Sequence, residues 1–410
     1  MSGPESDTAE RSFLLHAARA GVGTASFAPE LLAEVTHWEQ LFLLASQHAV
    51  TPLLCHALSK AIAGEIPGIA LTQRRAASRQ LLLRDAQLVT ALGQIFDLFR
   101  TNGISAIPFK GPLLAFQLYG QSSLRSSVDL DFLLRAEDVI CAKDILLSHG
   151  YKTDCPSEPS LEAAYLRVRH EMHFARDGSC AIELHQAFLP AFNRFIYDYD
   201  ALWTRLRRIR FNERDVLVMA PEDLLLALCA HGTKHVWGRL GWICDIARLL
   251  VRFREEIVWS RIDELASSLG ARRMVLLGSV LAHELLDAPL PAAILTRAHK
   301  DQMVTRLVTR VSDSWRLGIH CTPGVFGEHL FFLLARERFR DRAAYCAHLM
   351  FRPTEQDHAA FSLPRFLSTL YYPLHTLRVT TACARSSIHL ILAGPSRLQK
   401  LAFLLNSRIR

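Results

Sequence analysis

The stretch IPFKGPLLAFQLYGQSSLRSSVDLDFLL, residues 107–134, decides the fold because it interrupts a sequence that is otherwise helical in pattern. Its last residues, VDLDFLL, have the composition of a β-strand and carry two acids, Asp129 and Asp131. Successive side chains of a strand alternate between its two faces, so these carboxylates project together. A buried carboxylate is costly unless it is paired or holds a cation. The strand therefore predicts a charged site.

The sequence around this stretch predicts a compact α+β unit. A short apolar run at 104–109 and a helix at 112–120, with proline in its first turn, precede the acidic strand. Alternating residues at 170–188 surround an Asp177-Gly178 pair, which is a strong signal for a β-hairpin.

Helical patterns flank this unit on both sides. Apolar residues recur at helical spacing over 12–102 and again from Pro221 onward, and a further strand is expected within 209–220. Residues 1–9 are expected to be disordered. The predicted fold is therefore α+β, with a small mixed-sheet core between two helical regions. The expected divisions are 1–102 for the N-terminal helical region, 103–219 for the α+β core and 220–410 for the C-terminal helical domain.

Composition limits the class of protein. Half of the 410 residues are apolar and 21% are charged, which favours a sizeable core and excludes global disorder. The formal charge of +7 suits a polyanionic substrate, although an ordinary basic protein has the same balance. Short basic clusters such as RLRRIR at 205–210 lack interleaved aromatic residues, so nucleic acid is not the expected partner. No apolar run is long enough to form a transmembrane segment, and the nine cysteines form no CxxC motif, which together predict a soluble, cytoplasmic protein.

Paired carboxylates on one strand face predict a divalent cation. Asp129 and Asp131 repel each other unless a cation lies between them, and Mg²⁺ (or Mn²⁺) prefers such oxygen ligands together with water and phosphate. A third acid on a neighbouring strand usually completes a two-metal site, and Glu183 in CAIELHQ is the candidate. The alternative is a strand end at which the acids reach solvent, with Glu183 paired to an arginine.

Lys110 and Gly111 lie at the turn that opens the predicted helix. Backbone N–H groups at a glycine turn and a helix N-terminus can bind phosphate oxygens, and a lysine there can neutralise one of them. The string is not a Walker A loop, because GxxxxGK[ST] is absent. A solvated lysine and a glycine required only by the turn would look the same.

The order strand, glycine turn, helix and acidic strand resembles the uncharacterised bacterial nucleotidyltransferase family, a branch of the DNA polymerase β-like nucleotidyltransferase superfamily. The matching positions are Lys110-Gly111, Tyr119-Gly120, Arg125, Asp129, Asp131 and, as third acid in IELHQAF, Glu183. Segments 231–250 and 351–374 also resemble the family, so the likeness extends over roughly residues 35–375. One departure is Lys-Gly-Pro where well-characterised transferases have Gly-Ser, so their triphosphate contact cannot be copied directly.

The resemblance implies metal-dependent transfer of a nucleotidyl group from an NTP to an acceptor. It assigns Asp129 and Asp131 to metal binding, and Glu183 to metal binding or general-base catalysis. The implied nucleotide-binding residues are Lys110, Gly111 and Arg125, and Ser127 and Lys234 are further candidates for binding the nucleotide. Arg125 could instead pair with Asp129 when no metal is bound. Asp245 is expected to anchor helix packing through a buried ion pair.

Histidines gather in two places. If Asp177-Gly178 is a two-residue turn, His170 faces His185 on the same side as Glu183 and His173 points away, and a one-residue change in loop length reverses this choice. A zinc site among these histidines is the less favoured interpretation. His231 and His235 have a metal-compatible i, i+4 spacing, but they lack the glutamate of HExxH and are expected to be core or capping residues.

Several functions are compatible with these residues. The leading hypothesis is a nucleotidyltransferase whose acceptor is a small molecule, sugar phosphate, peptide or protein. A toxin-type transferase that modifies tRNA or a partner protein is the alternative suggested by the R-x-S-x-D-x-D string that ends at Asp131. A member that binds a nucleotide without transferring it is disfavoured, because all three candidate acids are present. The sequence identifies neither the nucleotide nor the acceptor.

Overall fold

The computed structural model describes residues 8–61, 66–156, 158, 162, 165–166, 169–318, 324–353, 357, 360 and 365–392. The chain forms two compact units, the first comprising residues 1–191 and 195–335 and the second residues 192–194 and 336–410. The three-part division expected from the sequence stays a prediction. Residues 1–7 of the segment expected to be disordered lie outside the described residues, and the first helix begins at Thr8.

Helices open the first unit, as the apolar spacing predicted. They are α1 (Thr8–Val22), the 3₁₀ helix η1 (Pro29–Glu34), α2 (Trp38–Gln47), α3 (Thr51–Leu58) and α4 (Gly68–Thr101). The long helix α4 ends at Thr101 with Asn102 as its C-cap residue, and Gly103 follows at a φ of +74°, a left-handed conformation that glycine adopts without strain. The predicted end of this helix is therefore confirmed.

A five-stranded mixed sheet follows α4. Its strands are β1 (Ala106–Pro108), β2 (Asp129–Leu134), β3 (Lys152–Thr153), β4 (Glu171–Ala175) and β5 (Ala181–His185), in the spatial order β1-β2-β5-β4-β3. Strand β2 pairs with β5 in parallel, and the other neighbours in this sheet are antiparallel. The helix α5 (Gly111–Tyr119) connects β1 to β2 by way of η2 (Ser122–Leu124), and η3 (Ala136–Asp138) and α6 (Val139–Ser148) follow β2. The predicted α+β fold with a small mixed sheet is confirmed.

One face of this sheet belongs to the hydrophobic core. Leu130 and Phe132 of β2 are almost completely buried, together with Ile182 of β5. They pack in one cluster with side chains of α4 and α6, for example Phe99, whose ring meets that of Phe132 edge to face at 5.6 Å. Because strand residues alternate, Asp129 and Asp131 point away from this core.

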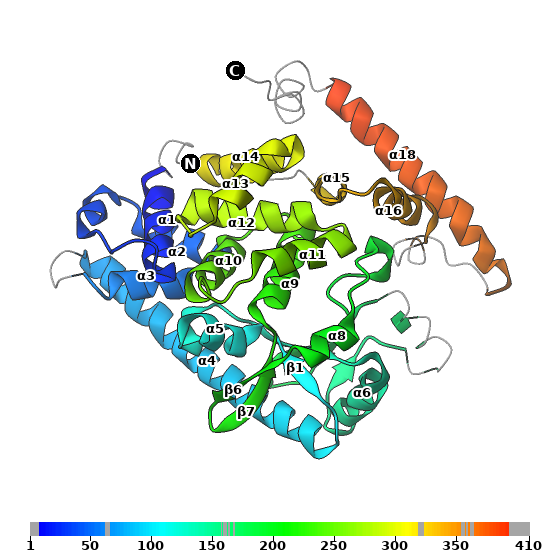
Figure 1. Ribbon diagram of the computed structural model, residues 1–410, viewed down its shortest axis with the longest axis horizontal. Coiled ribbons are helices and arrows are strands. Elements are labelled where there is room, and N and C mark those ends of the chain that lie inside the picture. The colour runs from blue at the N-terminus through cyan, green and yellow to red at the C-terminus, as the bar shows by residue number, and fades with distance from the viewer. Residues whose placement is uncertain are drawn as a thin grey trace. The chain divides into compact units, whose positions relative to one another are not determined.

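The rest of the first unit is mostly helical. After η4 (Ala191–Asn193), which the two units share, come α8 (Tyr199–Thr204) and a separate hairpin of β6 (Arg207–Phe211) and β7 (Arg214–Val218), where the sequence predicted one strand. The helices that follow are α9 (Pro221–Lys234), α10 (Leu240–Arg252), α11 (Trp259–Leu269), α12 (Arg272–Leu286), α13 (Ala292–Lys300), α14 (Gln302–Leu317) and α15 (Gly324–Ala335). The N-terminal helix α1 packs against α10 and α12, so the two helical regions of this unit touch (Figure 1).

The second unit contains α16 (Phe339–Phe351), the 3₁₀ helix η5 (Arg365–Leu370) and α18 (Tyr371–Leu392). The buried guanidinium of Arg336 donates to Asp341 at 2.7 Å, which pairs the two charges inside this unit. Among the described residues of the whole chain, no helix combines the length and the apolar character that crossing a membrane requires.

Candidate functional site

The parallel pairing of β2 and β5 brings two of the predicted acids side by side. Asp131 lies opposite Glu183 in the register, and Asp129 precedes Asp131 by two residues on the same face of β2. This is the face opposite to the hydrophobic core. The alternation of acids with leucine and phenylalanine in the sequence therefore separates a polar site from a packed core.

Asp131 is the most buried of these acids, with 3% of its surface exposed. Its Oδ1 accepts a hydrogen bond from Lys110 Nζ at 2.7 Å and lies 2.9 Å from Nε2 of His185, which is also buried. Burial alone would raise the pKa of this carboxyl, but the charge of Lys110 and the contact with His185 outweigh it and hold the pKa of Asp131 well below its usual value. Asp131 is therefore ionised in the folded protein.

Glu183 and Asp129 have opposite pKa shifts. Burial would raise the pKa of Glu183, but hydrogen bonds from His173 and His185 outweigh burial and lower it to about 2. His173 Nδ1 lies 3.2 Å from Glu183 Oε1, and His185 Nε2 lies 3.3 Å from Oε2. Burial and the neighbouring charges of Asp131 and Glu183 raise the pKa of Asp129 to about 6. Asp131 and Glu183 thus have close basic partners, whereas the weaker influence of Lys110 and Arg125 on Asp129 does not outweigh its burial.

The glycine turn places Lys110 beside the acids. Gly111 has a φ of +64°, and a Cβ there would lie 3.2 Å from the backbone oxygen of Asp129. The glycine is therefore required for the close approach of α5 to β2. Lys110 lines the cavity described below, whereas Gly111 is buried and does not line it. The predicted contact between Gly111 and phosphate stays a prediction.

Arg125 pairs with Asp245 and not with Asp129, which was the metal-free partner considered from the sequence. Its Nε lies 3.0 Å from both carboxylate oxygens of Asp245 in α10, and its Nη1 donates to Ser127 Oγ at 3.1 Å. Both side chains of the ion pair are largely buried. The predicted buried ion pair of Asp245 is confirmed, and it fixes Arg125 and Ser127 next to the acidic strand.

The register of the β4–β5 hairpin differs from the one expected for a two-residue turn. His173 faces Glu183, and Glu171 faces His185, so the pairing is shifted by one residue. The physical reason is that the connection between Ala175 and Ala181 is longer than the expected two-residue turn allows. It includes Gly178 at a φ of +71°. The expectation that His173 points away from Glu183 was therefore wrong.

Glu171 is a site residue that the sequence reasoning missed. Its Oε2 lies 2.9 Å from His170 Nε2 and 3.5 Å from His185 Nδ1. Lys234 at the end of α9 adds a cation, since its Nζ lies 3.5 Å from Glu171 Oε1 and 3.3 Å from His170 Nε2. Glu171 lies within the HEMH string at 170–173, but only the observed register shows that it faces His185.

His231 and His235 of α9 lie close to Trp242 of α10. Their ring centroids are 5.4 and 5.2 Å from the indole ring, and His235 is the C-cap residue of α9. Burial lowers the pKa of His231 well below its usual value. Neither histidine belongs to a potential metal-binding group within the described part of the chain. The predicted capping role holds for His235.

All of these elements surround one cavity of about 620 Å³. Its lining includes seven of the eight candidate residues, namely Lys110, Arg125, Ser127, Asp129, Asp131, Glu183 and Lys234. Within the described residues, Asp131, Glu183 and His185 form one potential metal-binding group, and His170, Glu171 and His185 form another. Asp129 lines the same cavity but belongs to neither group. A site of this size has room for a nucleotide-sized ligand.

Comparison with known proteins gives one match. A family model described as uncharacterised nucleotidyltransferase matches residues 34–287, which include every residue of the two potential metal-binding groups. The match ends before segment 351–374, part of which lies outside the described residues. No curated protein and no solved structure matches the chain.

Proposed function

Because the chain belongs to the uncharacterised nucleotidyltransferase family, we propose that it transfers a nucleotidyl group from an NTP to an acceptor. The acceptor in this proposal is a small molecule, sugar phosphate, peptide or protein. We further propose that the chain belongs to the DNA polymerase β-like superfamily and is a bacterial, cytoplasmic protein. The observation that carries it is the buried carboxylate of Asp131 next to Glu183, with Asp129 on the same strand face of a large cavity.

The residues of this site fit a divalent cation of the Mg²⁺ or Mn²⁺ class. Asp129, Asp131 and Glu183 offer carboxylate oxygens, which are the ligands such ions prefer. The pKa of Asp129 is about 6 because it is buried beside two other carboxylates, and a bound cation would relieve that repulsion. The ammonium group of Lys110 at Asp131 indicates that positive charge is favoured here.

Each acid would have its own part in the reaction. Bound divalent cations would lower the pKa of an acceptor hydroxyl and neutralise the leaving pyrophosphate. Asp131 would hold its cation as a permanently ionised ligand. Glu183, with a pKa of about 2, is a weak proton acceptor near neutral pH, which favours a cation-binding role over general-base catalysis. Asp129 would complete the ligand set, since a bound cation offsets the repulsion from Asp131 and Glu183 that raises its pKa to about 6.

The basic residues would bind the triphosphate. Lys110 and Lys234 present ammonium groups to the cavity from different elements, α5 and α9. Arg125 is held by Asp245, so its guanidinium is oriented before a substrate arrives. Such a preorganised cation loses little conformational entropy when phosphate binds.

A thermal unfolding experiment tests the nucleotide and metal requirement. The purified full-length protein is heated with Mg²⁺ or Mn²⁺ and each of ATP, GTP, CTP and UTP, beside the double variant Asp129→Asn/Asp131→Asn. We expect one NTP to raise the melting temperature only when the metal is present, and only in the wild type. Asp200→Asn is the matched control, because that side chain is 96% exposed and does not line the cavity.

Radiolabelled NTP then separates the candidate reactions. Nucleotidyl transfer is supported if an acceptor gains label from the α-phosphate and gains none from the γ-phosphate. Label on tRNA would identify the toxin-type activity. Metal-dependent stabilisation without transfer would leave a nucleotide-binding protein. The absence of stabilisation by all four NTPs in a folded protein would refute the proposal.

A further inference from the structure

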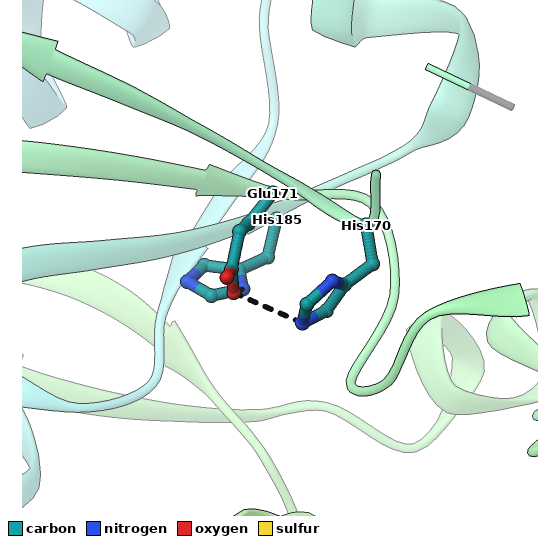
Figure 2. A group of neighbouring side chains, drawn as sticks. All are labelled: His170, Glu171 and His185. Atoms are coloured by element: carbon teal, nitrogen blue, oxygen red, sulfur yellow. Dashed lines mark ion pairs between the residues drawn. The ribbon is translucent and has the colours of Figure 1, made fainter. Parts of the chain in front are cut away.

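Glu171 lies between two buried imidazoles on the cavity side of strands β4 and β5. Figure 2 shows the side chains of His170, Glu171 and His185 pointing toward one another, with the carboxylate between the two rings. One ligand atom from each of these residues lies within 4.8 Å of the others. His170 and His185 are only 6% and 3% exposed. The geometry is that of a compact three-ligand group inside the protein.

The chemistry of these donors differs from that of the neighbouring acids. Two imidazole nitrogens and one carboxylate oxygen form the ligand set that Zn²⁺ and related borderline cations take, whereas an all-oxygen set suits Mg²⁺. We propose that His170, Glu171 and His185 bind a Zn²⁺-class cation, at a second site separate from the nucleotide-associated metal. This inference does not depend on nucleotidyl transfer.

The orientation of His185 supports a metal at its Nδ1. Its Nε2 lies 2.9 Å from Asp131 Oδ1, and its Nδ1 points to Glu171 Oε2 at 3.5 Å. Metal-bound histidines usually donate their other ring N–H to a carboxylate, which fixes the tautomer and raises the basicity of the ligating nitrogen. Asp131 is that carboxylate here. One imidazole would therefore connect the Zn²⁺-class site to the acid at the centre of the proposed active site.

Lys234 places a positive charge beside this group in the metal-free protein. Its ammonium group contacts both Glu171 and His170, so a metal ion must displace it. The lysine side chain is 28% exposed and lies at the end of α9, which allows it to turn into the cavity. The competing interpretation is that Lys234 is the permanent cation of a purely structural ion network.

Titration with Co²⁺ distinguishes these interpretations. The full-length protein, freed of metal by a chelator and kept in excess Mg²⁺, is titrated with Co²⁺ while the visible ligand-field bands are recorded. Zn²⁺ is then added as a competitor. We expect one equivalent of Co²⁺ to bind per protein chain and Zn²⁺ to displace that Co²⁺. His170→Ala and the nearly isosteric Glu171→Gln should each weaken binding by at least about tenfold, since even changes to groups that only hydrogen-bond a metal ligand have effects of that size.

Two controls separate this site from the nucleotide site. His235→Ala removes another imidazole of the same cavity and should leave Co²⁺ binding unchanged. Asp129→Asn should also keep the Co²⁺ bands, because Asp129 is not part of the three-ligand group, although it should lose metal-dependent stabilisation by NTP. The proposal is overturned if the wild type shows no ligand-field bands, or if folded Glu171→Gln binds Co²⁺ as tightly as the wild type.

Discussion

Replacing Lys110 by methionine tests whether the ion pair with Asp131 holds the site together. The substitution removes the ammonium group that lies 2.7 Å from Asp131 Oδ1 but keeps an apolar stem of similar length. The two side chains are only 12% and 2% exposed, so water cannot fully replace the lost cation. Asp131 would then remain ionised inside the protein with His185 as its main partner.

The structure sets the size of the effect. At an effective dielectric constant of about 20, unit charges at this separation attract each other by about 6 kcal/mol before desolvation is subtracted. Removal of one partner from a buried pair usually costs about 3–5 kcal/mol. Because His185 remains 2.9 Å from the same oxygen, we expect Lys110→Met to lower the free energy of unfolding by about 2–3 kcal/mol at pH 7.

Urea unfolding without divalent cations is the assay, with Asp131→Asn and the double variant completing a mutant cycle. The pair should show a coupling energy of about 2 kcal/mol. The pKa of Asp131 is lowered by folding, so its contribution is fully present above about pH 4 and is lost as the pH falls further. The difference between wild type and Lys110→Met should shrink accordingly. Equal unfolding free energies at pH 7, within about 0.5 kcal/mol, would refute this reasoning.

Three further changes have expected outcomes. Glu10→Gln should lower the free energy of unfolding by about 1–2 kcal/mol at pH 7 in urea unfolding, since the buried carboxylate accepts backbone N–H bonds. The loss should be smaller below about pH 4, because those bonds outweigh burial and lower the pKa of Glu10. Gly232→Ala should lower the melting temperature, as its Cβ would lie 2.6 Å from the buried ring of Trp237, which corresponds to about 1–3 kcal/mol of overpacking; an unchanged melting temperature would contradict this. Lys234→Met should tighten Co²⁺ binding several-fold in the titration above, and weaker binding would show that the lysine does not compete with the metal.

Local patterns in the sequence were sufficient to place the acids. The alternation in VDLDFLL determines that Asp129 and Asp131 share a face, whereas the pairing of β5 with β2, which brings Glu183 opposite Asp131, is seen only in the structure. The glycine turn before α5 was also predictable, since Gly111 adopts a conformation that other residues rarely adopt. These features depend on a few consecutive residues, which explains why the α+β fold and its central strand could be recognised.

Contacts between distant segments could not be predicted in the same way. Arg125 and Asp245 are 120 residues apart, and only the packing of α10 beside α5 brings them together. The register of the β4–β5 hairpin depends on a difference of one residue in the length of its connection. Because of that difference, Glu171 lies opposite His185. Glu171 therefore had no sequence signal of its own. The partner that a charged strand residue faces on the neighbouring strand can be identified only when the register is known.

The charge balance of the cavity explains why nucleotide and metal should bind together. The charged residues among its described lining are the acids Asp129, Asp131, Glu171, Glu183 and Asp245 and the bases Lys110, Arg125, Lys234 and Arg239. With neutral histidines, five acids against four bases leave a formal charge of −1, although the whole chain carries +7. Several of its bases are already paired with acids, which reduces the positive charge that they offer to a triphosphate. Each divalent cation adds two positive charges where the carboxylates repel each other, so metal binding changes the cavity from an anionic site into one that attracts phosphate.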